Sequence, residues 1–385
     1  MNIKLDSNLA KVKINGTEVD KVKYNGAVVW TKPAAQHIYG VSWNKTNSSS
    51  VLTRTDESAN FSNPVIYNAN TQNYGSPFDT LAPWKDIVRE SINGEEFVKI
   101  PKFWYKIENL QNTMTIQIAT YAETGFEVSP AHRARGPWGE RDYVYIGRYK
   151  ATYNAGLHSV SGQQYAKQTA ANLRGYTKPG TAAQGYFLND FSMLFTIWLL
   201  YLVEFADWNS QAKISYGCNP SSGTVVTGGT DNMPYHTGNV GNGSYGQAFQ
   251  YRYIEGLWAG ADVELVDGIR YTNNNYSVVI SECINPNEYG DSSKYIDSGS
   301  ATKSQGYITN WFDSGGYAGY TALFPGAVQS SAGYINDKWN FLGGTKYPIG
   351  VGGNSSQDTA AGLFHLYGPY ESTLINCRLQ YIPQT

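Results

Sequence analysis

Charged side chains are scarce in this chain of 385 residues, because Asp, Glu, Lys and Arg together make up only 16% of it. The formal net charge is -2 at pH 7, and the basic residues are not gathered into a block. Proteins that bind nucleic acids carry such a block, since it neutralises the phosphates. We therefore expect no nucleic-acid partner.

Cysteine is also scarce: the chain has three, Cys218, Cys283 and Cys377, and they lie far apart. No two of them have the spacing of a metal site or of a redox-active pair, and their number is odd. We expect all three to be small, buried apolar residues. One disulfide between two of them is the alternative.

Long apolar runs are absent too. The most apolar stretch, MLFTIWLLYLV at residues 193–203, is shorter than the roughly 20 residues that span a bilayer. It follows Asn189 and Asp190, either of which can cap a helix, so we expect a helix at residues 191–206 that is buried on most sides. The opening MNIKLDSNLA lacks the apolar core of a secretory signal. We therefore expect synthesis in the cytoplasm, without a signal peptide and without a membrane span.

Motifs for common enzyme chemistry are missing: there is no Walker loop, GxGxxG, HExxH or GxSxG. Glu255, Asp262, Glu264 and Asp267 could supply the carboxylate pair of a glycosidase or oxygen ligands for calcium. The segment GADVELVDG, which holds three of them, lacks the spacing of an EF-hand loop, and solvated or turn-capping roles are commoner for such acids. We expect no catalytic residue, no metal site and no cofactor, with calcium as the alternative.

A small basic loop contains His132, Arg133 and Arg135. Acidic residues follow closely, at Glu140 and Asp142. We expect these acids to pair with the loop, which gives it a structural role.

Tyrosine, tryptophan and glycine are abundant, with 31, 10 and 40 residues. Tyr and Trp provide large contact areas at a small loss of rotamer freedom, while Ser, Gly and Asn provide adaptable hydrogen bonds. This composition is typical of a surface that binds another molecule. Composition alone favours a simpler interpretation, a Gly-rich all-β protein with many turns.

Local patterns predict three regions along the chain. The near-copies VKINGTEV and VKYNGAVV, from residues 12 and 22, each place Asn-Gly between short strands, which is the strongest local hairpin signal. We expect residues 1–33 to form a small β-module for attachment or assembly and residues 34–125 to form a β-rich intermediate region. Helical patterns at residues 162–175 and 191–206, followed by many short strands, predict that residues 126–385 form a domain with two helices. The expected fold class is α+β.

The candidate binding residues lie near the end of the chain. In GLFHLYGPY, residues 362–370, alternation places Phe364 and Leu366 in the core and His365 and Tyr367 on the outer face. Other aromatic and amide residues occur in Gly-flanked loops, where side chains point outward. The expected ligand-binding set is Tyr334, Asn336, Trp339, Asn340, Tyr347, His365, Tyr367 and Tyr370.

Three groups of segments resemble a family of phage and prophage tail proteins. They are IYGVSWNKTNSSSVLTRTDESANF with SPFDTLAPW, IPKFWYK with GFEVSPAH, and LYLVEFADWNSQ with YGCN and QYRYIEGLW. The resemblance covers residues 38–379, and the opening VKINGTEVDKVKYNGAVVW is similar to N-terminal modules of tail and baseplate proteins. The C-terminal halves of the family look like C-type-lectin or formylglycine-generating-enzyme folds, so the resemblance implies a C-type-lectin-like domain at residues 126–385.

The match to the family's motifs is partial. The family often has an aromatic-Cys-Asp-Gly motif after YIEGLW, whereas this chain keeps Asp267 and Gly268 but has Leu265 and Val266 before them. The usual final Arg-Leu pair is present within NCRLQ. Formylglycine-generating enzymes use a nearby pair of cysteines, and Cys377 is the only cysteine after residue 283. This chemistry disfavours an oxidase.

The resemblance implies a receptor-binding protein at the tip of a phage tail, which recognises a bacterial surface protein or glycan and performs no chemistry. It also implies a homotrimer, contacts with other tail or baseplate proteins through the N-terminal module, and a C-terminal region of the kind diversified by retroelements. The alternatives are an enzyme, either a glycan-cleaving tailspike or a formylglycine-type oxidase, and a purely structural baseplate subunit.

Overall fold

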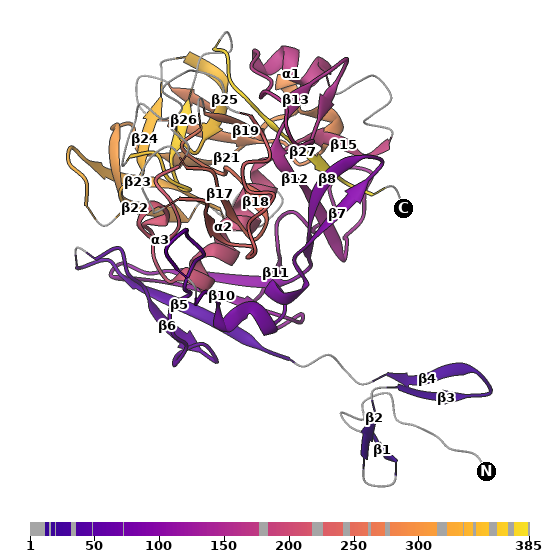
Figure 1. Cartoon of the computed structure of the whole chain (residues 1–385). Helices are drawn as coiled ribbons and strands as arrows, with labels where there is room; N and C mark the ends of the chain where they lie inside the picture. Colours follow the sequence, from indigo (N-terminus) through magenta and orange to yellow (C-terminus); the bar gives the residue numbers. More distant parts are fainter. Residues whose placement is uncertain are drawn as a thin grey trace. The chain divides into compact units, whose positions relative to one another are not determined.

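Figure 1 shows the computed structural model of the chain. The structure describes residues 12–14, 17–19, 21–31, 36–47, 49–71, 73–176, 184–217, 226–241, 247–260, 263–273, 278–313, 322–333, 335–341, 344–353, 360–368 and 373–383. Its contacts divide the chain into two compact units, Met1–His37 and Ile38–Thr385.

The first unit contains two antiparallel hairpins. Strand β1 (Val12–Ile14) pairs with β2 (Thr17–Val19), and β3 (Lys21–Tyr24) pairs with β4 (Ala27–Thr31). Asn25 and Gly26 join the second pair with φ values of 48° and 80°, the left-handed backbone that a two-residue type I′ turn requires. Both predicted hairpins are confirmed, although the Asn-Gly turn of the first, residues 15–16, lies outside the described residues.

Three large sheets build the second unit. The first has the order β11-β9-β10-β5-β6, with strands Glu127–Val128, Trp104–Asn109, Thr113–Ala119, Ile38–Asn44 and Thr53–Asp56. The second has the order β15-β27-β12-β8-β7, with strands Tyr186–Leu188, Arg378–Tyr381, Tyr143–Lys150, Glu95–Pro101 and Val88–Ile92. The third has the order β21-β20-β19-β25-β26-β24-β22-β23, with strands Ile296–Ala301, Val278–Glu282, Glu264–Asn273, Gly344–Val351, Leu366–Gly368, Lys338–Phe341, Gly306–Asp313 and Leu323–Gln329.

Shorter elements connect these sheets. Two small sheets have the orders β13-β14, from Thr152–Tyr153 and Leu157–His158, and β16-β17-β18, from Gly238–Asn239, Phe249–Tyr251 and Ile254–Glu255. The α-helices in the described part are α1 (Ala170–Tyr176), α2 (Phe191–Phe205) and α3 (Ser210–Lys213). The 3₁₀ turns in the same part are η1 (Pro77–Thr80), η2 (Trp84–Asp86), η4 (Pro286–Glu288) and η5 (Ser292–Lys294).

The predicted α+β fold class is wrong, because the protein is mostly β, with 44% strand and 14% helix. The helix expected at residues 162–175 begins only at Ala170. Before it, the backbones of Gln164, Tyr165 and Gln168 form β-bridges with Val226, Thr152 and Ile375. Long-range pairing therefore overrides helix propensity in that segment. The all-β interpretation of the Gly-rich composition was the better one.

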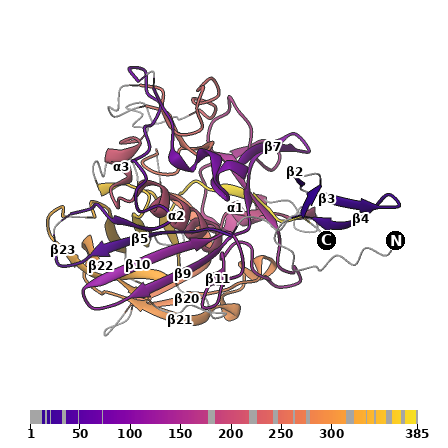
Figure 2. The same ribbon diagram turned by 90° about the horizontal axis from the view of Figure 1, so that it is seen from below.

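Helix α2 confirms the prediction of a buried helix. The Asp190 side chain accepts a hydrogen bond from the Met193 amide and caps the N-terminus, and Ala206 ends the helix in the left-handed conformation. All the residues of α2 are buried, and the helix packs against β5 and β10 of the first sheet (Figure 2) and against β19 of the third. An apolar surface on every side suits a helix enclosed in this way.

Residues on both sides of the expected boundary at 125 and 126 share one core. Tyr39, Trp43 and Ile116 of the β-rich intermediate region belong to the same buried cluster as Trp198 of α2 and Trp311 of the third sheet. The boundary therefore falls inside one compact unit.

None of the described helices is both long enough and apolar enough to cross a membrane.

Two of the three cysteines behave as expected. Cys283 and Cys377 are free and buried. Burial raises the pKa of the Cys283 thiol to about 11 and raises that of Cys377 further. Cys218 lies outside the described residues.

Candidate functional site

Five of the predicted ligand-binding residues, Asn336, Trp339, Asn340, His365 and Tyr367, are fully described and lie in or just before strands β24 and β26. These strands are parallel, with Trp339 opposite Leu366 and Asn340 opposite Tyr367. Asn340 and Tyr367 are half-buried, whereas Trp339 and Leu366 are fully buried in the core. Since side chains alternate between the two faces of a sheet, Asn340 and Tyr367 lie side by side on the face turned away from that core.

Two members of the predicted set are not on the surface. Trp339 is 0% exposed, and its indole nitrogen donates a hydrogen bond to the Thr302 carbonyl at 2.9 Å. Trp339 was expected in a Gly-flanked loop, but it lies in strand β24, where the alternation of side chains turns this large apolar ring inward. His365 is also 0% exposed, because its amide donates to the Gly362 carbonyl in a turn that precedes β26, where strand alternation does not apply.

The interior also determines the protonation of His365. Its Nδ1 donates to the Ala360 carbonyl at 2.7 Å. Burial lowers its pKa to about 4. The imidazole is therefore neutral at physiological pH, and its role is structural.

Four other members of the predicted set are Asn336, Tyr347, Tyr334 and Tyr370. Asn336 is half-buried and continues the outward positions of β24. Tyr347 lies in β25 opposite Tyr271, and its side chain is outside what the structure describes. Tyr334 and Tyr370 lie outside the described residues.

The structure adds two residues that the sequence interpretation missed. Lys338 lies between Asn336 and Asn340 on the outward side of β24, and it pairs with Tyr307 of β22. The Lys338 ammonium is 4.5 Å from the centroid of the Tyr307 ring, a cation–π contact. We call the set Tyr307, Asn336, Lys338, Asn340 and Tyr367 the C-terminal face. Only the pairing of distant strands reveals Tyr307, because nothing near it in sequence marks a site.

The acids considered for glycosidase chemistry have structural partners. Glu264 lies 3.1 Å from the Lys150 ammonium and 3.3 Å from the Arg378 guanidinium, and all three side chains are at most 2% exposed. Burial alone would raise the pKa of Glu264, but these two cations hold it below its usual value. Asp267 binds the Arg174 guanidinium through two contacts of 2.7 Å.

The other two acids considered are Glu255 and Asp262. Glu255 is buried and accepts hydrogen bonds from the Gly228 and Thr230 amides at 2.9 and 2.8 Å. Asp262 lies outside the described residues. Each of the three described acids is therefore occupied by neighbours, whereas a general acid needs access to its substrate.

The basic loop does not pair as expected. Arg135 binds Asp190 in the interior, and Arg133 donates to the Ser192 hydroxyl at 3.3 Å. His132 is fully buried, and burial lowers its pKa to about 3. Glu140 and Asp142 instead bind Lys102. The structural role was correct, but the partners are the first residues of α2 and the residue that caps it.

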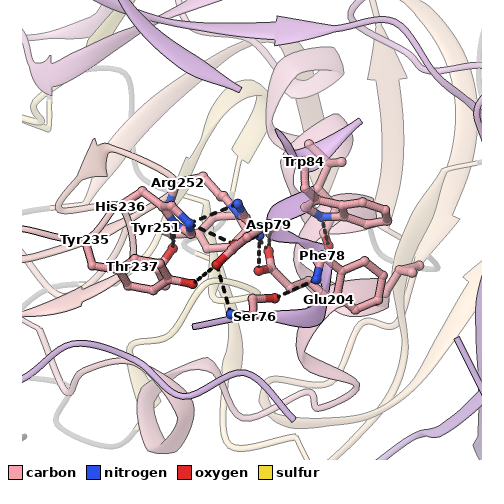
Figure 3. A network of polar contacts seen from close by, with 12 residues as sticks. Ser76, Phe78, Asp79, Trp84, Glu204, Tyr235, His236, Thr237, Tyr251 and Arg252 are labelled. Atoms are coloured by element: carbon pink, nitrogen blue, oxygen red, sulfur yellow. Dashed lines mark hydrogen bonds and ion pairs between the residues drawn. The ribbon is translucent and has the colours of Figure 1, made fainter. Parts of the chain in front are cut away.

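A second polar site lies around Asp79 (Figure 3). Asp79 is in η1, where its carboxylate accepts from the Ser76 amide at 3.0 Å and the Ser76 hydroxyl accepts from the Phe78 amide at 3.3 Å. This reciprocal capping box fixes the short turn. The Asp79 side chain remains 27% exposed, so the site borders the solvent.

Three residues from distant segments meet Asp79. The Tyr235 hydroxyl donates to its Oδ2 at 2.7 Å, and its Oδ1 lies 2.9 Å from both His236 Nε2 and the Arg252 guanidinium. Burial opposes ionisation of Asp79, but the contacts with His236, Arg252 and Tyr235 outweigh it and hold the Asp79 pKa well below its usual value. Burial lowers the pKa of His236. The carboxylate is therefore charged and fully bonded.

Arg252 connects this site to the core. It binds Glu204 of α2 in an ion pair whose side chains are 3% and 1% exposed, and the Tyr251 hydroxyl donates to the same carboxylate at 3.0 Å. Arg252 and Tyr253 form the two-residue turn between β17 and β18 with φ values of 46° and 70°. Residues other than Gly, Asn and Asp rarely adopt this backbone, which costs energy and is concentrated at functional sites.

Sequence reasoning missed this site for a physical reason. Ser76 and Asp79 have the spacing of a capping box, which is a local signal. His236, by contrast, is 157 residues from Asp79 in the chain. Nothing local predicts that they meet.

Among the described residues, no group of three or more His, Cys, Asp or Glu side chains is arranged to hold a metal ion. A scan of the chain against protein-family models found no match, and a search of curated proteins found no relative.

Proposed function

We propose that this chain is the receptor-binding protein of a phage or prophage tail tip. It recognises a protein or glycan of the bacterial surface and catalyses no reaction. The C-terminal face carries this proposal, because it places four half-buried aromatic, amide and amine side chains on three neighbouring strands and a fifth, Asn336, just before one of them. Aromatic groups among polar groups are typical of binding hot spots. The resemblance to tail proteins supplies the biological setting.

The environments of the described acids and of Cys377 favour a binding protein over an enzyme. Glu264 is held in a buried ion pair, Asp267 is buried and paired with the partly exposed Arg174, and the Cys377 thiol is buried with a raised pKa. A reactive cysteine needs a thiolate, which such an environment opposes. A glycan-cleaving enzyme and a formylglycine-type oxidase are therefore the weaker alternatives.

The first unit fits a role in assembly. Its hairpins are two-stranded, and their edge strands can pair with another chain. We propose that residues 1–37 attach the protein to other tail or baseplate proteins in a homotrimer. Several copies on one particle would then make weak single contacts sufficient. A purely structural baseplate subunit is the remaining alternative, in which the C-terminal face would be covered by a partner protein.

One experiment separates these functions. The purified full chain is fluorescently labelled and incubated with intact cells of the bacterium that carries the prophage, and the surface polysaccharide of that bacterium is incubated with the chain in parallel. We expect binding to cells and polysaccharide of unchanged length. Shortened polysaccharide would establish the tailspike-type enzyme instead. Absence of cell binding would contradict receptor recognition.

A further inference from the structure

A loop lies beside the Asp79 network, and the structure describes its residues 65–71 and 73–75. Val65 and Gly75 close its base with two backbone hydrogen bonds of 2.8 and 2.9 Å. Tyr67 joins it to β16, because its amide donates to the Thr237 carbonyl and its carbonyl accepts from the Asn239 amide, each at 3.0 Å. Gly238 permits this close approach, since a Cβ there would lie 2.1 Å from the Tyr67 carbonyl oxygen.

Two tyrosine rings of this loop meet a third, Tyr235, from a distant segment of the chain. Tyr67 packs edge-on against Tyr74, with ring centroids 5.6 Å apart, and Tyr74 packs against Tyr235 at 4.9 Å. Tyr74 is 38% exposed, while Tyr67 and Tyr235 are half-buried. We call these three residues the tyrosine platform. Exposed Val65 lies in the same loop.

The Asp79 network holds the platform in place. The Tyr235 hydroxyl donates to Asp79, and the Tyr235 ring lies 3.9 Å from the His236 ring (Figure 3). Asp79 is in turn bound by Arg252, which the buried Glu204 holds. A fully bonded polar network is rigid, and a rigid aromatic surface loses little entropy when it binds a ligand.

The charges of the network are not available to a ligand. Each carboxylate oxygen of Asp79 already has two partners, the Ser76 amide and Tyr235 hydroxyl on one and His236 and Arg252 on the other. Arg252 is 3% exposed and bonds two carboxylates. The exposed polar side chains of the loop include the amides of Asn70 and Asn73, which both donate and accept hydrogen bonds. Uncharged hydroxyl groups suit such amides.

We propose that the tyrosine platform is a binding site for a neutral saccharide. The C–H face of a pyranose ring stacks on Tyr74, and the amides of Asn70 and Asn73 exchange hydrogen bonds with its hydroxyl groups. This site shares no residue with the C-terminal face. It rests on the proposed receptor function only in its biological purpose, since saccharide binding itself is measured on the isolated protein.

The test is saturation-transfer NMR and titration calorimetry on the full chain. The neutral probes are the methyl glycosides of glucose, galactose and mannose and N-acetylglucosamine, and the charged probe is glucuronate. We expect saturation transfer to the ring C–H protons of at least one neutral probe, and weaker transfer to glucuronate. Tyr74→Ala should weaken the best neutral probe by at least about tenfold, whereas Tyr74→Phe should stay within about threefold, because the ring is retained.

Tyr153→Ala is the matched control. Tyr153 is 53% exposed and packs on Tyr176 at 4.4 Å, so it is also an exposed tyrosine resting on another tyrosine. We expect this variant to bind like the unchanged protein. Asn73→Ala removes an exposed amide without touching the rings, and a loss of affinity there supports the site even if Tyr74→Ala does not fold.

Three results would overturn the site: no transfer to any neutral probe, equal binding of glucuronate, or equal losses in Tyr74→Ala and Tyr153→Ala. Cell binding by the unchanged protein is measured alongside. Saccharide binding without cell binding refutes the receptor function and leaves the site standing. Cell binding without saccharide binding refutes the site alone.

Discussion

Arg378 and Glu264 form an ion pair in the interior, with nitrogen and oxygen 3.3 Å apart and side chains 0% and 2% exposed. Arg378 lies in the last strand, β27, and Glu264 begins β19, so the contact joins the second and third sheets. Lys150 of β12 binds the same carboxylate. Buried ion pairs therefore connect strand β27 and strand β12 to strand β19.

Glu264→Gln should destabilise the protein strongly. The substitution removes the negative charge that two buried cations share, which costs about 3–5 kcal/mol. Urea unfolding at neutral pH measures the free-energy change. Lys106→Gln is the control, because its partner Glu108 is 50% exposed, and such surface pairs contribute about 0.2–1 kcal/mol. Similar losses in the two variants would contradict a buried ion pair.

Asp337 should make the protein less stable as the pH rises. Its carboxyl is buried, which raises its pKa from 3.8 to about 7. Between these values the folded state holds a proton that the unfolded state has released, so this residue's contribution to stability falls as pH rises from 3.8 to about 7. Asp337→Asn cannot ionise. Urea midpoints measured from pH 4 to 8 should therefore fall less steeply, or rise more, with pH in Asp337→Asn than in the unchanged protein. Parallel profiles would show that Asp337 does not titrate in this range.

Leu199→Asp should prevent folding. Leu199 is 0% exposed within α2, and an unpaired buried charge costs several kcal/mol. Soluble yield and cooperative thermal unfolding measure the effect. Leu110→Asp places the same charge at a residue that is 63% exposed, and it should fold normally. A cooperatively folded Leu199→Asp protein would refute the burial of α2.

The double variant Asn340→Ala with Tyr367→Ala should lose at least about 2 kcal/mol of binding to host cells, because it removes an adjacent aromatic and amide pair from the C-terminal face. Both residues are half-buried, but Tyr367 also packs against the buried cluster that contains Leu265 and Leu379. The melting temperature should therefore fall modestly, and binding is compared among folded proteins. Trp339→Ala removes a ring that lies in the core, so it should instead cost about 3–5 kcal/mol of stability. Unchanged cell binding by the double variant would place the receptor site elsewhere.

Deleting residues 1–37 should leave cell binding intact and prevent incorporation into particles. The deleted part is a separate compact unit, and the C-terminal face lies wholly in the other. Binding of the shortened chain to cells and its presence in purified particles are measured separately. Lost binding with normal incorporation would reverse the proposed roles.

Local features of this protein could be predicted from sequence. Asn25-Gly26 forms its turn because both residues tolerate a positive φ, and Asp190 caps α2 because its carboxylate reaches the Met193 amide. Helix α2 is apolar on all sides, so its burial can be predicted without knowing which elements cover it. These properties depend on neighbours in the chain, which the sequence itself specifies.

The binding surfaces and the fold class depended on the tertiary structure. Trp339 and Asn340 were expected in Gly-flanked loops, whereas both lie in strand β24, and only the packing of the third sheet decided that Trp339 faces the core and Asn340 does not. His365 escapes alternation because a turn, not a strand, holds it. Asp79 meets Tyr235 and His236 only when η1 and a loop far along the chain are brought together. Long-range strand pairing and side-chain packing decide such contacts, and no local pattern of residues encodes them.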